Sequence, residues 1–280
     1  MSDVIDPAEP TAKFPDLAGR VAVVSGTSRG IGIGIAEVLG SQGMRLVLAA
    51  RSAEKGSAVA DRLSAAGVEC IFVPADLATP AGAQEVFDAA VRRFGRIHLL
   101  VNNAAKLSSR SILELDEDEY RQSFEGNVRM VYGPSRLVAR HMVEAGGGGN
   151  IIHISSVGGL RAHRGLAGYD ASKGAIDALT RSMALDLAAY CIRVNTVAPG
   201  ATDRTQPPRP APPPPPRPVP REGRRRRDVT LIPLQRAGTP HEVGWAVAFL
   251  ASDVAAYVTG QVFYVDGGLV AQLVPPGIWV

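Results

Sequence analysis

Short apolar runs alternate with longer stretches of helical period along most of the chain. Residues 21–26 (VAVVSG) are almost continuously apolar, which is typical of a strand buried on both faces. Residues 33–43 instead place Ile35, Val38 and Leu39 on one helical face. The strand pattern recurs at 45–50, 70–75, 98–104, 150–156, 191–200 and 261–268, with helical patterns between these runs at 54–66, 81–94, 119–144, 168–189 and 240–252.

This alternation predicts a doubly wound α/β fold. Strand, helix and strand at this spacing require right-handed crossovers, which build a single parallel, Rossmann-type sheet with helices on both faces. We expect one domain over residues 17–280, preceded by a disordered extension at residues 1–16. Such sheets bind ligands beyond the carboxyl ends of their strands, so the residues that follow each apolar run are the candidates for a site.

The segment 206–227 interrupts this pattern with ten prolines and seven arginines, and it is predicted to form neither a helix nor a central strand. The formal net charge of the chain is +3; this segment contributes +6, which leaves −3 for the rest. The basic pI is therefore local, which argues against a nucleic-acid-binding fold. Three interpretations stay open: an altered substrate lid, an added arm for a proline-binding or acidic partner, and a local corruption of the sequence.

Cysteine usage and the N-terminus indicate the setting of the protein. Cys70 and Cys191 lie in separate apolar runs, so we expect buried core thiols rather than a disulfide or a metal pair. No apolar run reaches the length of a bilayer span. Residues 1–16 are acidic and broken by proline, whereas a signal peptide is basic and then apolar. We therefore expect a cytoplasmic protein with no metal, membrane or nucleic-acid partner.

A glycine-rich turn follows the first predicted strand. Gly26, Gly30 and Gly32 stand between that strand and the first helix, where glycine lets the backbone approach a phosphate and the helix start presents free N–H groups to it. The spacing G-x-x-x-G-x-G is longer than the six-residue dinucleotide fingerprint, because residue 35 is isoleucine. Here the chain resembles the short-chain dehydrogenase/reductase family, and the resemblance implies further cofactor contacts from Ser28 and Ile31.

The end of the second strand indicates which dinucleotide binds. An acidic residue at this place accepts hydrogen bonds from the adenosine ribose, whereas a cation meets an added 2′-phosphate. This chain has Ala50 followed by Arg51, and Arg29 lies in the glycine turn. Two guanidinium groups can flank a phosphate with charge-assisted hydrogen bonds. The sequence therefore predicts NADP(H) as the preferred cofactor, with NAD(H) possible.

Ser156, Tyr169 and Lys173 form the candidate catalytic set. Tyr169 and Lys173 are four residues apart in a helical pattern and so share a face, and this lysine is one of four in a chain with 26 arginines. Reduction of a ketone by hydride needs a proton donor at the developing alkoxide, and an ammonium beside a phenol favours the phenolate. A serine hydroxyl stabilises the carbonyl oxygen as its charge develops.

The family resemblance, which covers about residues 17–200 and 231–268, implies further roles. It places Asn127 at a water of the proton relay, although a polar residue that kinks the helix is the alternative. The remaining implied cofactor contacts are Asp76 and Leu77 at the adenine, Asn103 and Ala104 in the turn after the fourth strand, and Pro199, Gly200 and either Thr202 or Thr205 near the nicotinamide. For Asn103, a role in bracing the central strands is equally expected. Ala105 departs from the family pattern, which has glycine there.

The predicted function is hydride transfer between a nicotinamide and a small ketone or secondary alcohol. A 3-oxoacyl-(acyl carrier protein) reductase is the nearest alternative, although the helix ends at 146–149 and 188–190 lack basic residues that suit an acidic carrier. The alternative from another class is a dinucleotide-binding sensor or scaffold without turnover. His153 and His163 are further acid–base candidates, but His153 lies mid-strand and is expected to pack in the core.

The resemblance also implies a homo-oligomer, a dimer or tetramer. The C-terminal tail LVAQLVPPGIWV (269–280) is apolar, and an interface between subunits would bury it.

Overall fold

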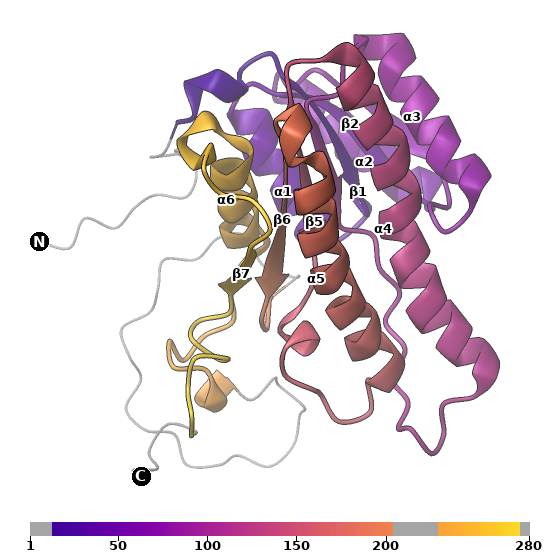
Figure 1. Cartoon of the computed structure of the whole chain (residues 1–280), viewed down its shortest axis with the longest axis vertical. Helices are drawn as coiled ribbons and strands as arrows, with labels where there is room; N and C mark the ends of the chain where they lie inside the picture. Colours follow the sequence, from indigo (N-terminus) through magenta and orange to yellow (C-terminus); the bar gives the residue numbers. More distant parts are fainter. Residues whose placement is uncertain (1–12, 204–228, 275–280) are drawn as a thin grey trace, which may run out of the picture.

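The computed structural model describes residues 13–203 and 229–274. Its strands form a parallel sheet with the order β3-β2-β1-β4-β5-β6-β7 (Figure 1). The strands are β1 (Val21–Ser25), β2 (Arg45–Ala50), β3 (Cys70–Pro74), β4 (Leu99–Asn102), β5 (Gly149–Ile154), β6 (Ile192–Pro199) and β7 (Val262–Val265). The predicted doubly wound parallel sheet is thereby confirmed.

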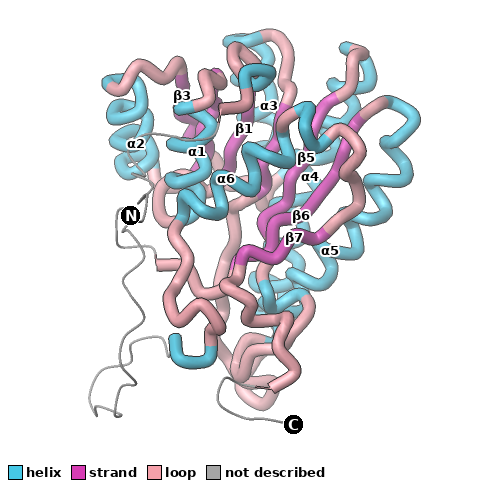
Figure 2. The backbone as a smooth tube through the Cα atoms, turned by 90° about the vertical axis from the view of Figure 1, so that its left-hand side faces the viewer, coloured by secondary structure: helices cyan, strands magenta, loops and turns pink. Residues whose placement is uncertain are grey.

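Helices cover both faces of this sheet. They are α1 (Ile31–Ser41), α2 (Ala53–Ala65), α3 (Pro80–Phe94), α4 (Glu117–Ala145), α5 (Ala167–Leu187) and α6 (Pro240–Ala251). Short 3₁₀ turns are η1 (Pro15–Leu17), η2 (Val157–Gly159), η3 (Ala188–Tyr190), η4 (Val229–Leu231) and η5 (Asp253–Ala255). Helices α1, α2 and α6 pack on one face, and α3, α4 and α5 pack on the other (Figures 1 and 2).

The continuous apolar runs reflect burial on both faces. Val24 and Leu48 belong to the core beneath α1 and α6, whereas Val23 and Val47 belong to the core beneath α3 and α4. Successive side chains of a strand point to opposite faces, so a two-sided core requires an apolar residue at every position. All five residues of β1 are buried accordingly.

The strand order reverses at β1. The chain runs outward from β1 through β2 to β3 and then returns to β4, so that β1 pairs with β2 on one side and with β4 on the other. The connections after β1 and β4 therefore diverge toward opposite faces, and a crevice opens beyond their carboxyl ends. This is the place where the candidate residues were expected.

Helix α6 supports α1 from behind. A Cβ added at Gly34 would lie 2.4 Å from Pro240, and one added at Gly244 would lie 2.8 Å from the carbonyl oxygen of Gly34, so glycine is needed at both positions. The start of α6 is held by a capping box: Thr239 Oγ1 accepts from the backbone N–H of Glu242, whose carboxylate accepts from the Thr239 N–H.

At the N-terminal side, packing begins earlier than residue 17. The Phe14 N–H donates to Gln42 Oε1 at 2.9 Å, and Leu17 is fully buried. Most of the predicted extension, residues 1–12, lies outside the described residues. The division into an extension and a domain remains a prediction.

The prediction for the cysteines was wrong in one respect. Both thiols are free, but Cys191 is exposed and Cys70 is only partly buried. Cys191 has a left-handed backbone with φ of 57° and links η3 to β6, so the apolar run that suggested burial starts one residue later. None of the helices within residues 13–203 and 229–274 is long and apolar enough to cross a membrane.

Candidate active site

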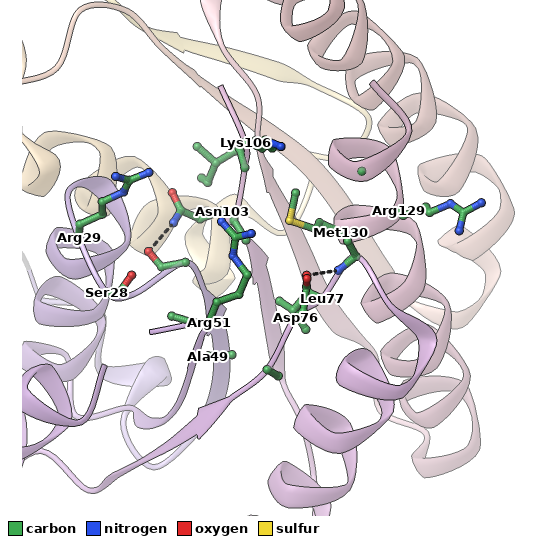
Figure 3. A pocket seen from close by; sticks show the side chains of 18 of the residues that line it. Ser28, Arg29, Ala49, Arg51, Asp76, Leu77, Asn103, Lys106, Arg129 and Met130 are labelled. Carbon is green, nitrogen blue, oxygen red and sulfur yellow. Dashed lines mark hydrogen bonds between the residues drawn. The ribbon is translucent and has the colours of Figure 1, made fainter. Parts of the chain in front are cut away.

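A cavity of about 760 Å³ lies at the carboxyl ends of β1, β2, β4 and β5 (Figure 3). It coincides with the reversal of the strand order. Twelve of the residues predicted to bind the cofactor or catalyse the reaction line it: Gly26, Ser28, Arg29, Gly30, Ile31, Arg51, Asp76, Leu77, Asn103, Ala104, Tyr169 and Lys173. The other six lie outside its lining: Gly32, Asn127, Ser156, Pro199, Gly200 and Thr202.

The glycine turn brings three backbone segments into contact. A Cβ added at Gly32 would lie 2.3 Å from the carbonyl oxygen of Gly26, and one added at Gly26 would lie 2.7 Å from Asn103 Nδ2. Gly30 has a φ of 63° and is the N-cap residue of α1, and no side chain caps this helix start. The first turn of α1 is thus open toward the cavity, which is the arrangement that binds an anion.

Asn103 braces the central strands and also lines the cavity. Its Nδ2 donates to the carbonyl oxygen of Ser25 at 2.8 Å, and its backbone N–H donates to Ser25 Oγ at 2.9 Å. The turn after β4 is therefore fixed to the end of β1. The two roles foreseen for this residue are compatible in the structure.

Cations gather where β2 ends. Arg29 from the glycine turn and Arg51 after β2 approach the cavity from different segments (Figure 3). Ser52, the residue before α2, lacks a side-chain capping hydrogen bond, and Lys55 lies in the first turn of that helix; both line the same cavity. A hydroxyl and three cations at this strand end suit a phosphate group.

Asp76 shapes the turn after β3. Its Oδ1 accepts from the Ala78 N–H at 3.0 Å, and the neighbouring Leu77 is buried against the core. The turn presents these two residues to the cavity beside the end of β2 (Figure 3). An apolar side chain beside a carboxylate can hold the flat face and the amino edge of a base.

Tyr169 and Lys173 stand one turn apart on α5, as their spacing predicted. Lys173 is buried, with 2% of its surface exposed, and its Nζ donates to the carbonyl oxygen of Ile154 at 2.8 Å. The same Nζ lies 5.4 Å from the centroid of the Tyr169 ring. Burial lowers the pKa of Lys173 to about 8, and the negative charge of Asp177 opposes this effect.

Ser156 lies at the end of β5 and begins the turn η2. Its Oγ accepts from the Gly158 N–H at 3.0 Å, and the residue is 8% exposed. Gly158 and Gly159 let η2 approach α5 closely: an added Cβ would lie 2.1 Å from Asp170 Oδ1 in the first case and 2.4 Å from Asp177 Oδ2 in the second. The hydroxyl hydrogen of Ser156 remains available for another acceptor.

Asn127 joins three elements through its side chain. Oδ1 accepts from the Lys106 N–H at 2.7 Å, while Nδ2 donates to the Lys106 carbonyl oxygen and to Ser172 Oγ. The side chain thus ties α4 to the connection after β4 and to α5. Helix α4 runs unbroken through this position, from Glu117 to Ala145.

The residues after β6 lie beside β7. The Gly200 N–H donates to the Val265 carbonyl oxygen at 3.0 Å, and an added Cβ at Gly200 would lie 2.8 Å from Asp266. Thr202 is 4% exposed, donates through Oγ1 to the Gly200 carbonyl oxygen and forms a parallel bridge with Gly238. Thr205 and the segment 206–227 lie outside the described residues.

Comparisons with known proteins agree on one family. A family model described as enoyl-(acyl carrier protein) reductase matches residues 26–270. The NADP-dependent (R)-specific alcohol dehydrogenase of Lentilactobacillus kefiri is 35% identical over 91% of this chain and 98% of that protein. The 3-oxoacyl-(acyl-carrier-protein) reductase FabG of Vibrio cholerae is 34% identical over 91% and 98%. The crystal structure of acetoin dehydrogenase YohF from Salmonella typhimurium is 32% identical, with a TM-score of 0.79 over 90% of this chain and 98% of that one.

The chain is a short-chain dehydrogenase/reductase. Its family comprises oxidoreductases that act on CH–OH and carbonyl groups, as the relatives above illustrate.

Sequence reasoning missed part of the lining of this short-chain dehydrogenase/reductase. Ser52 and Lys55 were not singled out, although a lysine near the second strand end was a usable signal in a chain with four lysines. One wall also comes from α4 and the connection before it: Lys106, Arg121, Gln122, Glu125, Gly126, Arg129 and Met130. These residues follow the ordinary period of an amphipathic helix, which does not distinguish a cavity from solvent.

The two histidines considered as acid–base candidates in this short-chain dehydrogenase/reductase, His153 and His163, lie in different surroundings. His153 is fully buried, its Nδ1 lies 3.1 Å from Asn102 Nδ2, and burial lowers its pKa to about 3. A neutral ring that accepts from the asparagine amide fits the predicted packing role. The His163 side chain is 41% exposed, and its Nδ1 lies 2.9 Å from Asp170 Oδ1. Neither histidine lines the cavity.

Proposed function

We propose that the protein is an NADP(H)-dependent oxidoreductase that interconverts ketones and secondary alcohols. The observation that carries this proposal is the Tyr169–Lys173 pair: both side chains line one cavity, and the ammonium is buried within 5.4 Å of the ring centroid. A bound nicotinamide supplies the hydride in reduction and takes it up in oxidation.

The residues of the chain supply the proton and orient the substrate. In reduction, the Tyr169 hydroxyl gives its proton to the carbonyl oxygen as the C–O bond becomes that of an alcohol, and in oxidation the phenolate takes the proton back. The ammonium of Lys173 stabilises the phenolate electrostatically. Ser156 donates its hydroxyl hydrogen to the same oxygen. Asn127, whose side chain joins Lys106 to Ser172, would hold a water of the proton relay.

The lining fits a dinucleotide. Gly26, Ser28, Gly30 and Ile31 form a cradle at the uncapped start of α1 for the pyrophosphate. The glycines are needed there, since a Cβ at Gly26 would reach 2.7 Å from Asn103. The other groups would bind along its length: Asp76 and Leu77 at the adenine, Asn103 and Ala104 at the ribose side, and Pro199, Gly200 and Thr202 at the nicotinamide.

The charges at the β2 end favour NADP(H) over NAD(H). Arg29, Arg51 and Lys55 all line the cavity. Arg51 stands near the end of β2, where an acidic residue would accept hydrogen bonds from the adenosine ribose of NAD(H). We expect NADPH to bind at least tenfold more tightly than NADH in fluorescence titrations. Arg51→Ala should abolish most of this preference by weakening NADPH binding, while its affinity for NADH stays within threefold of the native value. Tighter binding of NADH by the native protein would refute the preference.

The reaction is tested by NADPH oxidation with a panel of ketones, diketones and 3-oxoacyl thioesters. Tyr169→Phe keeps the ring and removes the proton donor, so turnover should fall about 10³-fold or more while NADPH affinity stays within a few-fold. Substantial residual turnover would overturn the assignment. A protein that binds NADPH but oxidises it with no member of the panel would favour the sensor or scaffold.

A carrier-protein substrate is the second candidate, and the similarity to FabG favours it. The discriminating comparison uses one 3-oxoacyl group on a short pantetheine thioester and on an acyl carrier protein. A reductase of free small molecules should show similar kcat/KM for both. A preference above tenfold for the carrier-bound form would establish the carrier protein as a partner.

We also infer that the chain forms a homo-oligomer. Large apolar side chains are exposed on α4, on α5 and near the end of the described chain: Tyr132, Leu185 and Leu273 are 54%, 81% and 87% exposed. Burial of such surface favours association. Light scattering should give a mass of two or four chains, and a monomer at micromolar concentration would contradict this inference.

A further inference from the structure

Asp177 is a buried carboxylate one helical turn after Lys173. Both residues lie on α5, four positions apart, and are 6% and 2% exposed. Residues at this spacing share a helix face. A carboxylate is rarely buried without a partner, because transfer of a charge out of water is costly. Its Oδ1 has no hydrogen-bond partner within the described part of the chain.

The turn that carries Ser156 packs directly on this pair. A Cβ added at Gly159 would lie 2.4 Å from Asp177 Oδ2 and 3.2 Å from the Lys173 carbonyl oxygen. Ser155 Oγ lies 3.4 Å from the same carbonyl oxygen. The absence of a side chain at Gly159 thus makes room for the carboxylate beside the catalytic elements.

The charged neighbours of Asp177 are mainly cationic. Burial raises the pKa of Asp177, whereas a hydrogen bond with Ser155 and the charges of Lys173 and Arg181 lower it. In return, Asp177 raises the pKa of Lys173 against the effect of burial. The carboxylate and the ammonium therefore stabilise each other's charged forms.

Other titratable groups around the pair differ in their effect. On β7, burial and then the charges of Asp177 and Asp266 raise the pKa of Tyr264, so this phenol stays neutral. On β5, His153 is neutral because burial lowers its pKa to about 3. On α5 itself, Asp170 is paired with His163. Of the two buried carboxylates on α5, Asp177 is the one whose charge raises the pKa of Lys173.

We propose that Asp177 is a positioning residue that holds the positive charge on Lys173 and so extends to higher pH the range over which the Tyr169–Lys173 pair keeps its transferable proton. This inference rests on the proposed roles of Tyr169 and Lys173. Removal of a nearby negative charge makes the loss of a proton from the pair easier. The effect should therefore appear at the alkaline side of the reduction.

The first test is the pH profile of ketone reduction by Asp177→Asn. The alkaline limb of kcat/KM should move down by about one pH unit, as expected for one charge at partly screened short range. Below that limb, at pH 6, kcat/KM should stay within twofold of the native value. Asp186→Asn is the matched control, because it removes the same charge from an exposed position of α5 and should leave the limb in place.

The second test measures the lysine itself and needs no turnover. The full-length chain has four lysines, so selective ¹³C labelling gives four side-chain NMR signals, of which that of Lys173 is assigned by its loss in Lys173→Arg. The Lys173 signal should titrate near pH 8 in the native protein. It should titrate about one unit lower in Asp177→Asn. Asp177→Glu, which restores the carboxylate, should return the midpoint toward the native value.

The two tests separate the inference from the proposed function. If no ketone is reduced but the lysine midpoint shifts, the inference on Lys173 holds and the proposed reaction fails. An unchanged midpoint, or an activity loss that is equal at all pH values, overturns the inference and leaves the reaction intact. Asp177→Ser repeats both measurements should the asparagine variant not fold. If neither Asp177→Asn nor Asp177→Ser folds and binds NADPH, the proposed role of Asp177 is also wrong, because the carboxylate would then be required for folding.

Discussion

The glycine turn on the proposed cofactor side of the cavity is closely packed backbone around the Asn103 side chain, whereas α5 on the proposed catalytic side carries buried ionisable side chains. Gly26 and Gly32 bring the ends of β1 and β4 and the start of α1 so close that no further side chain fits beside that of Asn103. On α5, the ionisable side chains of Lys173 and Asp177 are instead buried, and burial lowers the pKa of Lys173 and raises that of Asp177. The first construction resists changes of volume, and the second responds to changes of charge and pH.

The largest effect should come from neutralising the catalytic side. Lys173→Met removes the ammonium beside Tyr169, so kcat should fall about 10³-fold because the phenolate loses its counter-charge. NADPH affinity, measured by fluorescence, should change less than tenfold. Lys106→Met is the control, since Lys106 lines the same cavity but pairs with Gln122. An equal fall of kcat in Lys173→Met and Lys106→Met would show that the effect does not depend on the ammonium beside Tyr169.

The cofactor side should instead respond to a single methyl group. In Gly32→Ala the new Cβ would lie 2.3 Å from the Gly26 carbonyl oxygen, a backbone atom that cannot rotate away. We expect a loss of about 3 kcal/mol in the free energy of unfolding and NADPH binding weakened at least tenfold.

Gly126→Ala is the matched control for this prediction. Gly126 lines the same cavity from within α4, and the nearest atom to an added Cβ lies 4.0 Å away. A helical glycine replaced by alanine should be neutral or stabilising by up to about 1 kcal/mol. Chemical denaturation measures the free energy of unfolding of both variants. If Gly32→Ala is as stable as Gly126→Ala, the glycine turn does have room for a side chain, and the prediction is wrong.

Acid should lower the free energy of unfolding through protonation of His153, which lies on β5. Its pKa is about 3 in the folded chain and near 6.5 when unfolded, so the unfolded chain binds the proton first as the pH falls. The stability contribution is complete above pH 6.5 and declines toward pH 3, by about 2 kcal/mol at pH 5. His98, whose pKa falls to about 4 mainly through burial, acts in the same direction.

Denaturation of the native protein and of His153→Asn at pH 7 and pH 5 measures this contribution. The variant should lose less stability than the native protein between these two pH values. Equal losses would show that His153 is not titrating on unfolding.

The smallest effect concerns the support behind the cofactor side. Thr239→Ala removes the cap of α6, the helix that packs on α1 through Gly34 and Gly244. The expected cost is about 1 kcal/mol in the free energy of unfolding, with NADPH affinity unchanged. A large loss of affinity would show that the glycine turn depends on the position of α6.

The strands and helices could be predicted well, because the residues that face each core are apolar and recur at the period of the strand or helix that carries them. The same reasoning located Tyr169 and Lys173, since spacing alone puts them on one helix face. It did not find Asp177, because an aspartate in a helix is usually exposed to solvent, whereas here η2 covers it and the glycine at position 159 leaves room for the carboxylate. Lys55 escaped for a similar reason: the approach of α2 to the cavity depends on sheet geometry rather than on local pattern.

The bridge between Thr202 and Gly238 joins the chain after β6 to the chain before α6. At this junction the Asp203 N–H donates to the Gly238 carbonyl oxygen at 2.8 Å. For a chain closed at its base, doubling the length enclosed costs only about 0.6 kcal/mol. By this estimate, a change in the length of chain between residues 203 and 238 should have little effect on the free energy of unfolding. The pairing of β6 with β7 and the capping box of α6 should stay in place, provided that the buried Ile232 keeps its packing.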